Sequence, residues 1–268
     1  MNKTIHMYWG GEKLSYLRYL TIVSLQKQNP DWRICVYVPT TVYSGDIKWV
    51  SLAHVIKYRG PDYFDAMLHL DIDVVHVDFD KIGFLNNRPE PYKSDYLQWY
   101  ILYRQGGFWS DTDVIYYKPL PDFSDWDIVA TADLFTSVYY IAYMYANPNT
   151  SVFKTLSTMA KSSLDFKNYQ AYGNILFRQA CGKCEDLVFF NPDLKIKIER
   201  PEITLPVKCI RDIKTIYESE KVDCSESIGL HWFGGHPLSG RWENILVDEK
   251  SVMEHDNVLC RRIIGAIR

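Results

Sequence analysis

Residues 3–39, KTIHMYWGGEKLSYLRYLTIVSLQKQNPDWRICVYVP, decide the fold class of this chain. The segment opens with a strand-like run at 3–9 that ends in a Gly-Gly turn. Residues 13–28 carry leucines at helical spacing, and Pro30 ends this helix because proline cannot continue it. Residues 33–39 are rich in β-branched and aromatic side chains, as in a second strand. A strand, a helix and a strand in this order predict a parallel sheet with a right-handed crossover.

The rest of the chain continues this alternation. A helix is expected at 93–107, with Ser94 or Asp95 as its N-cap and Gly106 and Gly107 at its end. The other expected strands are 54–59, 108–120, 126–133, 139–148 and 195–206, and the other expected helices are 149–163 and 173–181. No internal repeat and no linker rich in Pro, Gly or Ser divides the chain, so we expect one α/β domain over residues 1–268.

Composition limits the classes of function. The chain has 268 residues, of which 47% are hydrophobic, so a sizeable core is available. Its net charge of −3 gives no basic field, so no nucleic-acid partner is expected. The N-terminus lacks a signal-peptide pattern, and no apolar run reaches the roughly 18 residues of a membrane span. A cytoplasmic protein is therefore expected.

The six cysteines stand at irregular spacing. Cys181 and Cys184 form a CxxC pair that could join Cys209 and Cys224 in a zinc site, but the second two are not closely spaced. Reduced free thiols are the favoured interpretation.

Two aspartates, Asp111 and Asp113, end the aromatic stretch GGFWSDTDV at residues 106–114. Side chains at i and i+2 can turn toward one site where a strand ends. Carboxylate oxygens suit hard cations such as Mg²⁺ and Mn²⁺, which keep coordination positions for substrate phosphates. The pair can therefore hold a metal that neutralises a diphosphate. General acid and base catalysis, as in a glycosidase, and a solvated loop are the other interpretations.

A second pair, Asp71 and Asp73 in the stretch HLDID, is the rival candidate for a metal site. It lacks the context of the first pair, which follows an amphipathic helix, a Gly-Gly stop and an aromatic strand. We therefore rank this pair second.

Three separated segments resemble one family of enzymes. KSDYLQWYILYRQGGFWSDTDV (93–114) resembles the DXD sugar-binding region of nucleotide-sugar glycosyltransferases with the GT-A fold. IHMYWGG (5–11) is similar to the first strand of that family, and LHWFGGHPLSGRW (230–242) to its closing segment. The resemblance is greatest to glycosyltransferase family 32, which includes capsular polysaccharide synthesis proteins and initiating mannosyltransferases. The clostridial glucosylating toxins share the pattern.

This resemblance implies a fold and a role for each half of the chain. The expected GT-A fold is a single Rossmann-like, mostly parallel sheet flanked by helices, with a C-terminal lid segment. Residues 1–125 would bind the nucleotide sugar, and residues 126–268 would bind the acceptor and supply the lid.

The resemblance also implies roles for individual residues. Asp111 would contact the donor ribose or sugar, and Asp113 would bind Mn²⁺ or Mg²⁺, which bridges the diphosphate and acts as a Lewis acid on the leaving group. His231 would supply a further metal or diphosphate contact. Asp95 would hydrogen-bond the donor sugar. The family usually has arginine where this chain has Gln98, and this uncharged residue leaves the donor sugar open.

The donor site is expected to extend beyond these residues. Trp9 would stack on the nucleotide base, and Gly10 would let the backbone approach the nucleotide. In the lid, Arg241 or His236 would contact phosphate while Trp242 seals the site. The complete expected donor site is Met7, Trp9, Gly10, Ser94, Asp95, Asp111, Thr112, Gly235, Arg241 and Trp242.

The acceptor side gives weaker signals. Tyr139, Tyr140, Tyr143 and Tyr145 either line an acceptor groove or belong to a half-buried strand. Asp133 is a candidate base for an inverting reaction, although the resemblance implies retention.

We therefore expect a metal-dependent glycosyltransferase that moves a sugar from a nucleotide sugar to a glycan or other hydroxyl acceptor. A UDP-sugar is the favoured donor and a GDP-sugar the alternative. The expected catalytic residues are Asp95, Gln98, Asp111 and Asp113. A carboxylate-pair glycoside hydrolase and a non-catalytic sugar-binding module are the competing classes. Dependence of the activity on a metal distinguishes the glycosyltransferase from the hydrolase. Affinity for a nucleotide distinguishes it from the sugar-binding module.

Overall fold

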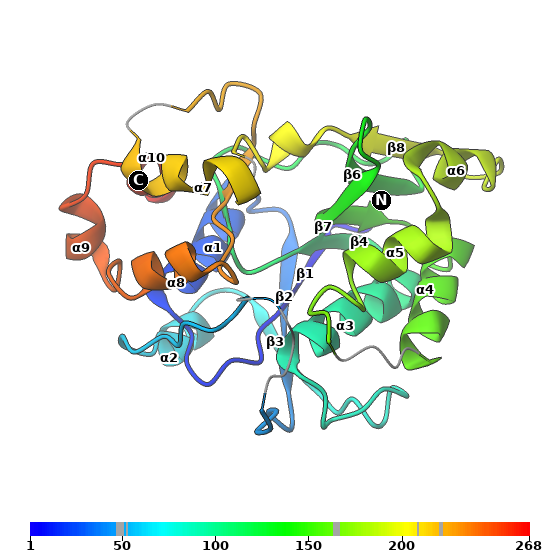
Figure 1. Cartoon of the computed structure of the whole chain (residues 1–268), viewed down its shortest axis with the longest axis horizontal. Coiled ribbons are helices and arrows are strands. Elements are labelled where there is room, and N and C mark those ends of the chain that lie inside the picture. Colours follow the sequence, from blue (N-terminus) through cyan, green and yellow to red (C-terminus); the bar gives the residue numbers. More distant parts are fainter. Residues whose placement is uncertain (47–50, 52, 163–166, 208, 220–221) are drawn as a thin grey trace.

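A mixed sheet of seven strands forms the centre of the molecule, and helices cover both of its faces (Figure 1). The computed structural model describes residues 1–46, 51, 53–162, 167–207, 209–219 and 222–268. In spatial order the strands are β3 (Asp73–Val77), β2 (Arg33–Pro39), β1 (Thr4–Tyr8), β4 (Gly107–Ser110), β7 (Val138–Ala146), β6 (Ile128–Asp133) and β8 (Ile196–Glu199). A separate two-stranded sheet pairs β5 (Val114–Tyr116) with β9 (Gly229–His231).

The strand directions determine where a site can form. β3, β2, β1 and β4 run parallel, β7 is antiparallel to β4 and β6, and β8 is parallel to β6. The expected α/β fold with a mostly parallel sheet is therefore confirmed. Because β1, β2 and β4 are parallel, the residues that follow them, Trp9, Thr40 and Asp111, meet at the carboxyl edge of the sheet.

The helices form a layer on each face and a third layer beside the second sheet. α3, α4 and α5 pack a core on one face, and α1 packs against the other. The C-terminal helices α7, α9 and α10 pack with α1, β5 and β9. The helices are α1 (Tyr16–Gln28), α2 (Phe64–Leu68), α3 (Glu90–Arg104), α4 (Ser151–Ser162), α5 (Asn174–Cys181), α6 (Cys184–Phe189), α7 (Cys209–Glu218), α8 (Pro237–Glu243), α9 (Glu249–Met253) and α10 (Val258–Ile267). No helix in the described part of the chain combines the length and apolar character that crossing a membrane requires.

α3 begins earlier than the sequence pattern suggests. We expected Ser94 or Asp95 to cap this helix, but it starts at Glu90. Pro91 fits the first turn because its φ is already helical and its missing amide needs no partner there. Ser94 and Asp95 therefore lie inside the helix, and the Asp95 carboxyl is not used as a cap.

The single strand expected at 108–120 is two strands that belong to different sheets. β4 ends at Ser110, β5 begins at Val114, and residues 111–113 form the turn between them. Continuous extended geometry would place two carboxylates on one packed face of the main sheet, which is costly without compensating partners. The paired aspartates therefore occupy the junction between the sheets.

Of two other expected strands, one is wrong and one is shorter than expected. Residues 54–59 form turns and irregular structure, and the free edge of β2 pairs instead with the β-branched run of β3. The strand expected at 195–206 is limited to β8, because Pro201 begins a short 3₁₀ helix and proline has no amide for a strand ladder.

The described cysteine side chains are buried free thiols, Cys35, Cys181, Cys184, Cys224 and Cys260. The side chain of Cys209, which we weighed as a zinc ligand, lies outside the described part.

Candidate metal and donor site

The DXD turn leaves the sheet at the carboxyl end of β4. The amide of Asp111 donates to the carbonyl of Ala142 on β7 at 3.1 Å, and its Oδ1 accepts the indole N–H of Trp109 at 3.0 Å. The Ser110 Oγ and Tyr116 Oη atoms lie 3.0 Å apart across the turn. These contacts fix the strands on both sides of the turn and orient the Asp111 carboxyl.

β9 brings a histidine against the second aspartate. The pairing of β5 with β9 places Val114 opposite His231. His231 Nε2 lies 3.0 Å from Asp113 Oδ1, and the amide of Gly234 donates to Asp113 Oδ2 at 2.7 Å. Ligand atoms of Asp111, Asp113 and His231 all lie within 4.8 Å of one another. The structure thus assembles the three residues that the sequence suggested as metal ligands.

The charges of these three groups depend on one another. Burial raises the pKa of Asp111 to about 6, and the Asp113 carboxylate adds to this. Burial also opposes ionisation of Asp113, but His231 and then Arg18 outweigh it and hold the pKa of Asp113 well below its usual range. Burial disfavours the imidazolium of His231, yet the two aspartates raise its pKa. The site therefore concentrates negative charge that a positive group must compensate.

This arrangement fits a divalent cation. Asp113 Oδ1 is buried and lies at ion-pair distance from His231, but no described group forms a hydrogen bond with it. Two ligands at right angles around an ion with bonds of about 2.1 Å stand about 3 Å apart, which matches the separation of these two atoms. Two carboxylates and one imidazole form a donor set suited to Mn²⁺, and the carboxylates also suit Mg²⁺.

Asp95 approaches the DXD turn from α3. Burial raises the pKa of Asp95 well above its usual range, and the charge of Asp111 contributes. Its Oδ2 also lies against Gly173, where an added Cβ would come within 2.8 Å. Gln98, one turn further along α3, is buried, and its Nε2 donates to the carbonyl of Ile141 at 2.8 Å. A contact between Gln98 and the donor stays a prediction.

The residues expected to bind the donor lie around the end of β1. One face of the Trp9 indole carries the Arg18 guanidinium, 4.7 Å from the ring centroid. Gly10 lies so close to Glu90 that an added Cβ would come within 2.1 Å of its carboxylate. Met7, in contrast, is fully buried in the core. The backbone at Gly10 therefore has no room for a side chain.

Two further donor candidates lie near the aspartates. Thr112 is buried at the centre of the DXD turn, and its Oγ1 accepts a hydrogen bond from Arg18 Nη1 at 2.8 Å. Ser94 is partly exposed on α3, next to Asp95 in the chain.

Beyond His231, the C-terminal segment contacts Asp113 through the backbone amide of Gly234. The carbonyl of Gly235 accepts the amide of His54 at 2.8 Å. Arg241 is exposed on α8, and Trp242 stacks on Tyr217 with 5.3 Å between ring centroids. Trp242 thus packs among the C-terminal helices in this conformation. Donor contacts of Gly235, Arg241 and Trp242, and movement of a lid, stay predictions.

The acceptor candidates are mostly part of the core. Tyr139, Tyr143 and Tyr145 are each at most 1% exposed on β7, so of the two interpretations the strand applies to these three. Tyr140 is partly buried on β7. Asp133 accepts the amides of two residues in the β6–β7 hairpin, and its role as a base stays a prediction.

Three neighbours of the site were not expected from the sequence: Arg18, Trp232 and Glu243. Arg18 and Glu243 form an ion pair at 3.0 Å, with side chains only 10% and 7% exposed. One signal was present, because Arg18 interrupts an otherwise apolar part of its helix, and a charge in that position must be paired.

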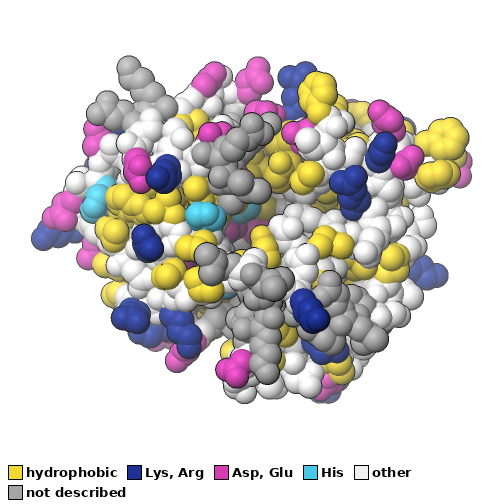
Figure 2. Space-filling view, viewed as in Figure 1, with side chains coloured by type: hydrophobic (Ala, Val, Ile, Leu, Met, Phe, Trp, Pro, Cys, Tyr) yellow, Lys and Arg dark blue, Asp and Glu magenta, His cyan; other side chains and the backbone are white. Residues whose placement is uncertain are grey.

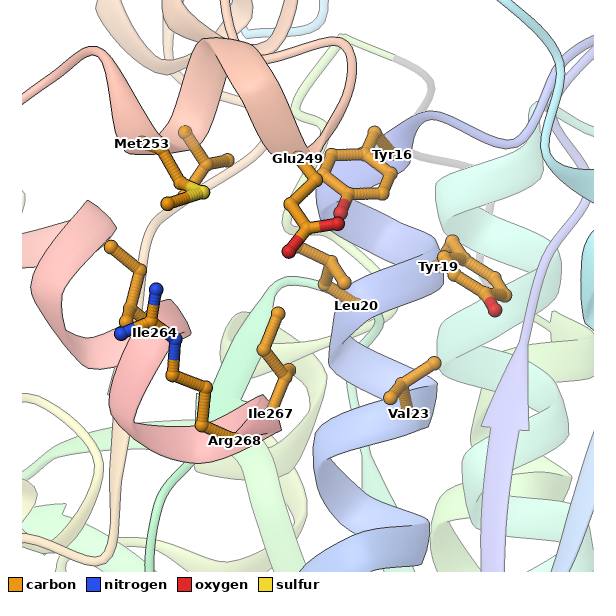
Figure 3. A pocket seen from close by; sticks show the side chains of 10 residues that line it. Tyr16, Tyr19, Leu20, Val23, Glu249, Met253, Ile264, Ile267 and Arg268 are labelled. Carbon is orange, nitrogen blue, oxygen red and sulfur yellow. The ribbon is translucent and has the colours of Figure 1, made fainter.

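The surface shows where a ligand could enter. Histidine and acidic side chains gather around a hollow near the middle of one face (Figure 2). A separate cavity of about 320 Å³ lies between α1, α9 and α10 and is lined mainly by apolar side chains such as Leu20 and Ile264 (Figure 3). Its α1 residues lie on a different face of that helix from Arg18, so this cavity is not part of the metal site.

Comparison with known families agrees with this geometry. Residues 17–133 match the family described as "Glycosyltransferase sugar-binding region containing DXD motif". The chain therefore carries a DXD glycosyltransferase region, which confirms the expected enzyme class, while membership of family 32 stays a prediction. No curated protein sequence matches the chain.

Several solved structures are similar in fold. The WbbM bifunctional glycosyltransferase, in its apo form, has a TM-score of 0.50 and 9% identity, over 98% of this chain and 49% of that one. The PaToxG glycosyltransferase has a TM-score of 0.47 and 18% identity, over 72% and 70% of the two chains. The galactosyltransferase LgtC, solved with donor and acceptor sugar analogs, has a TM-score of 0.38 and 18% identity, over 75% of this chain and 74% of that one. At these identities the likeness concerns the fold alone, and the WbbM correspondence spans nearly all of this chain.

Proposed function

We propose that this chain is a divalent-metal-dependent glycosyltransferase that transfers a sugar from a nucleoside diphosphate sugar to a hydroxyl group of a glycan acceptor, with retention. The observation that carries this proposal is the cluster of Asp111, Asp113 and His231 at the carboxyl edge of the parallel strands. Open α/β sheets bind nucleotide ligands at this edge. The DXD glycosyltransferase region at residues 17–133 supports the same class of reaction.

The residues around the cluster have separable tasks. Asp111, Asp113 and His231 would hold Mn²⁺ or Mg²⁺, which supplies Lewis-acid stabilisation of the departing diphosphate. Asp95 approaches the same space from α3 and would bind a hydroxyl of the donor sugar. Because burial raises its pKa, the Asp95 carboxyl can donate as well as accept a hydrogen bond.

The nucleotide would lie beyond the diphosphate, toward the end of β1. Trp9 offers part of an aromatic surface for the base, whereas the space beside Gly10 is occupied by the Glu90 side chain. A UDP-sugar is the favoured donor for a glycosyltransferase of this kind, and a GDP-sugar is the alternative.

The competing classes fit the site less well. A carboxylate-pair hydrolase separates its two carboxyl groups by about 5 to 9.5 Å, so that a sugar or a water fits between them. The ligand atoms of Asp111 and Asp113 lie within 4.8 Å of each other and of His231, which favours one shared cation. A sugar-binding module would not need this cluster.

The test is release of free nucleotide from a panel of UDP- and GDP-sugars, with MnCl₂ or with EDTA. We expect slow hydrolysis of one donor, abolished by EDTA and by Asp113→Asn. Titration of UDP and GDP in the presence of Mn²⁺ accompanies the panel. The absence of both hydrolysis and nucleotide binding would overturn the proposal.

A further inference from the structure

A buried arginine on α1 contacts the middle residue of the DXD turn. Arg18 Nη1 donates to Thr112 Oγ1, the middle residue of the turn, at 2.8 Å. Its Nε donates to Glu243 Oε1 on α8 at 3.0 Å. The Arg18 side chain is only 10% exposed. One guanidinium thus links the turn that carries both aspartates to the C-terminal segment.

Two tryptophans hold this guanidinium by its faces. The centroid of Trp9 lies 4.7 Å and that of Trp232 lies 5.2 Å from Arg18 Cζ. Trp9 follows β1, and Trp232 follows the metal-ligand candidate His231. Cation–π contacts of this kind become stronger as the cation is removed from water. The arginine therefore touches both chain segments that flank the DXD turn.

The orientation of Arg18 is fixed on its remaining sides. Glu243 Oε1 also accepts a hydrogen bond from Ser15 Oγ at 2.5 Å, so its charge is satisfied by two donors. At Gly234, whose amide binds Asp113, an added Cβ would come within 2.4 Å of Arg18 Nη2. Because the planar guanidinium is bonded along two edges and packed on its faces, lysine cannot reproduce its contacts.

We propose that Arg18 is a positioning residue for the metal site, and this inference rests on the proposed function. It acts through Thr112, whose hydroxyl it binds, and so sets the directions of the neighbouring Asp111 and Asp113 carboxylates. Through Glu243 and Trp232 it also holds the segment that carries His231 against the same turn. The charge of Arg18 also stabilises the Asp113 carboxylate, and its hydrogen bond to Thr112 adds a geometric constraint on the turn.

The test measures binding of Mn²⁺ alone, by calorimetric titration, to the wild type and to the variants Arg18→Met, Thr112→Val and Arg18→Met/Thr112→Val. Thr112→Val removes only the hydroxyl and keeps the shape of the side chain. Arg33→Met is the matched control, because the Arg33 side chain is 66% exposed at the other end of the sheet. Thermal unfolding of each variant shows that it is folded.

We expect Arg18→Met and Thr112→Val each to weaken Mn²⁺ binding by about tenfold or more, as loss of groups that orient metal ligands does. The double variant should bind no more weakly than Arg18→Met, because the two residues act through one contact. Arg33→Met should bind as the wild type does. If Arg18→Met does not fold, Thr112→Val alone decides the outcome.

The contrary outcomes are distinct. If the wild type binds Mn²⁺ and Thr112→Val binds it equally well, the inference is wrong and Arg18 only supports the fold. Additive effects in the double variant would overturn it as well. If the wild type itself binds neither Mn²⁺ nor a nucleotide, the proposed function fails with it.

Discussion

The chain contains four Asp-x-Asp pairs. The two that were weighed as metal sites lie at opposite ends of parallel strands. Asp111 and Asp113 follow the last residue of β4, whereas Asp71 precedes β3 and Asp73 begins it. Asp73 forms an ion pair with Arg33 at 2.5 Å, and these side chains are 47% and 66% exposed. The Asp113 side chain is only 13% exposed. The same short motif is therefore a surface feature in one place and an enclosed cluster in the other.

This difference teaches that the position of a strand, more than the motif itself, makes a ligand site. At the carboxyl edge of central strands, later parts of the chain can pack over the turns, and here β9 adds His231 and the amide of Gly234. β3 is an edge strand, and its first residues lie at the opposite edge of the sheet. Among the described residues, only the first pair belongs to a cluster that could hold a metal ion.

The largest expected difference between the two pairs is in catalysis. Asp113→Asn should lower the rate of donor hydrolysis by about 1,000-fold, because it removes a ligand of the cation that we propose to stabilise the leaving diphosphate. Asp73→Asn should change the rate by less than about twofold, since this side chain contacts only a surface arginine. Nucleotide release at saturating Mn²⁺ measures both rates. Equal losses in the two variants would refute the contrast.

A second difference between the centre of the sheet and its edge is in the pH dependence of stability. The histidines to compare are His6 on β1 and His76 on β3. His6 Nε2 lies 2.9 Å from the carbonyl of Gly106, which can only accept, so Nε2 carries the proton and Nδ1 accepts from Tyr37 Oη at 3.0 Å. Burial lowers the pKa of His6 from 6.5 to about 4. Between pH 6.5 and pH 4, His6 is protonated in the unfolded chain but neutral in the folded one. The free energy of unfolding should therefore fall by up to about 3 kcal/mol as the pH drops through this range.

Urea unfolding at pH 7 and pH 4.5 measures this loss. The variant His6→Asn should lose this part of the pH dependence, and His76→Asn, at an exposed position of β3, should keep it. An unchanged pH dependence in His6→Asn would show that other groups cause the loss.

A third comparison concerns the histidines near the two pairs. His231→Asn should weaken Mn²⁺ binding by at least about tenfold, because the imidazole is replaced by a weaker ligand. His69→Asn is the matched control, since His69 is exposed two residues before Asp71. Calorimetric titration with MnCl₂ measures both affinities. A larger effect of His69→Asn would place the cation at the second pair.

The smallest expected effect is on stability. Asp73→Asn should lower the free energy of unfolding by no more than about 1 kcal/mol, because the Asp73–Arg33 pair is exposed to water and screened by salt. Urea unfolding at low and high ionic strength measures this loss and its screening. A loss well above this value would mean that the pair holds the edge of the sheet in place.

Local signals account for the parts of the fold that the sequence predicts well. β1, α1 and β2 follow from an apolar strand, leucines at helical spacing and the stop at Pro30. The start of α3 and the existence of β3 were missed, because residues 61–92 have no sustained periodicity. The division of 108–120 into two strands was also missed, since it depends on partners that are distant in sequence.

The residues of the site also differ in whether local sequence signals identify them. Asp111 and Asp113 could be recognised from the motif and its flanking helix and glycines, and His231 only by resemblance. The Arg18–Glu243 pair joins residues 225 positions apart, and no local pattern specifies such a pairing. Physical reasoning from one sequence therefore finds the candidate cation ligands more readily than the groups that hold them in place.

The contact between Gly234 and Asp113 spans 121 residues of the chain, and it has a consequence for biosynthesis. Every strand of the main sheet is translated before β9, so a nascent chain can complete that sheet while its DXD turn still lacks His231. Domains fold progressively as they leave the ribosome. Under the proposed function, sugar transfer would begin only after β9 has emerged, because the metal site needs His231.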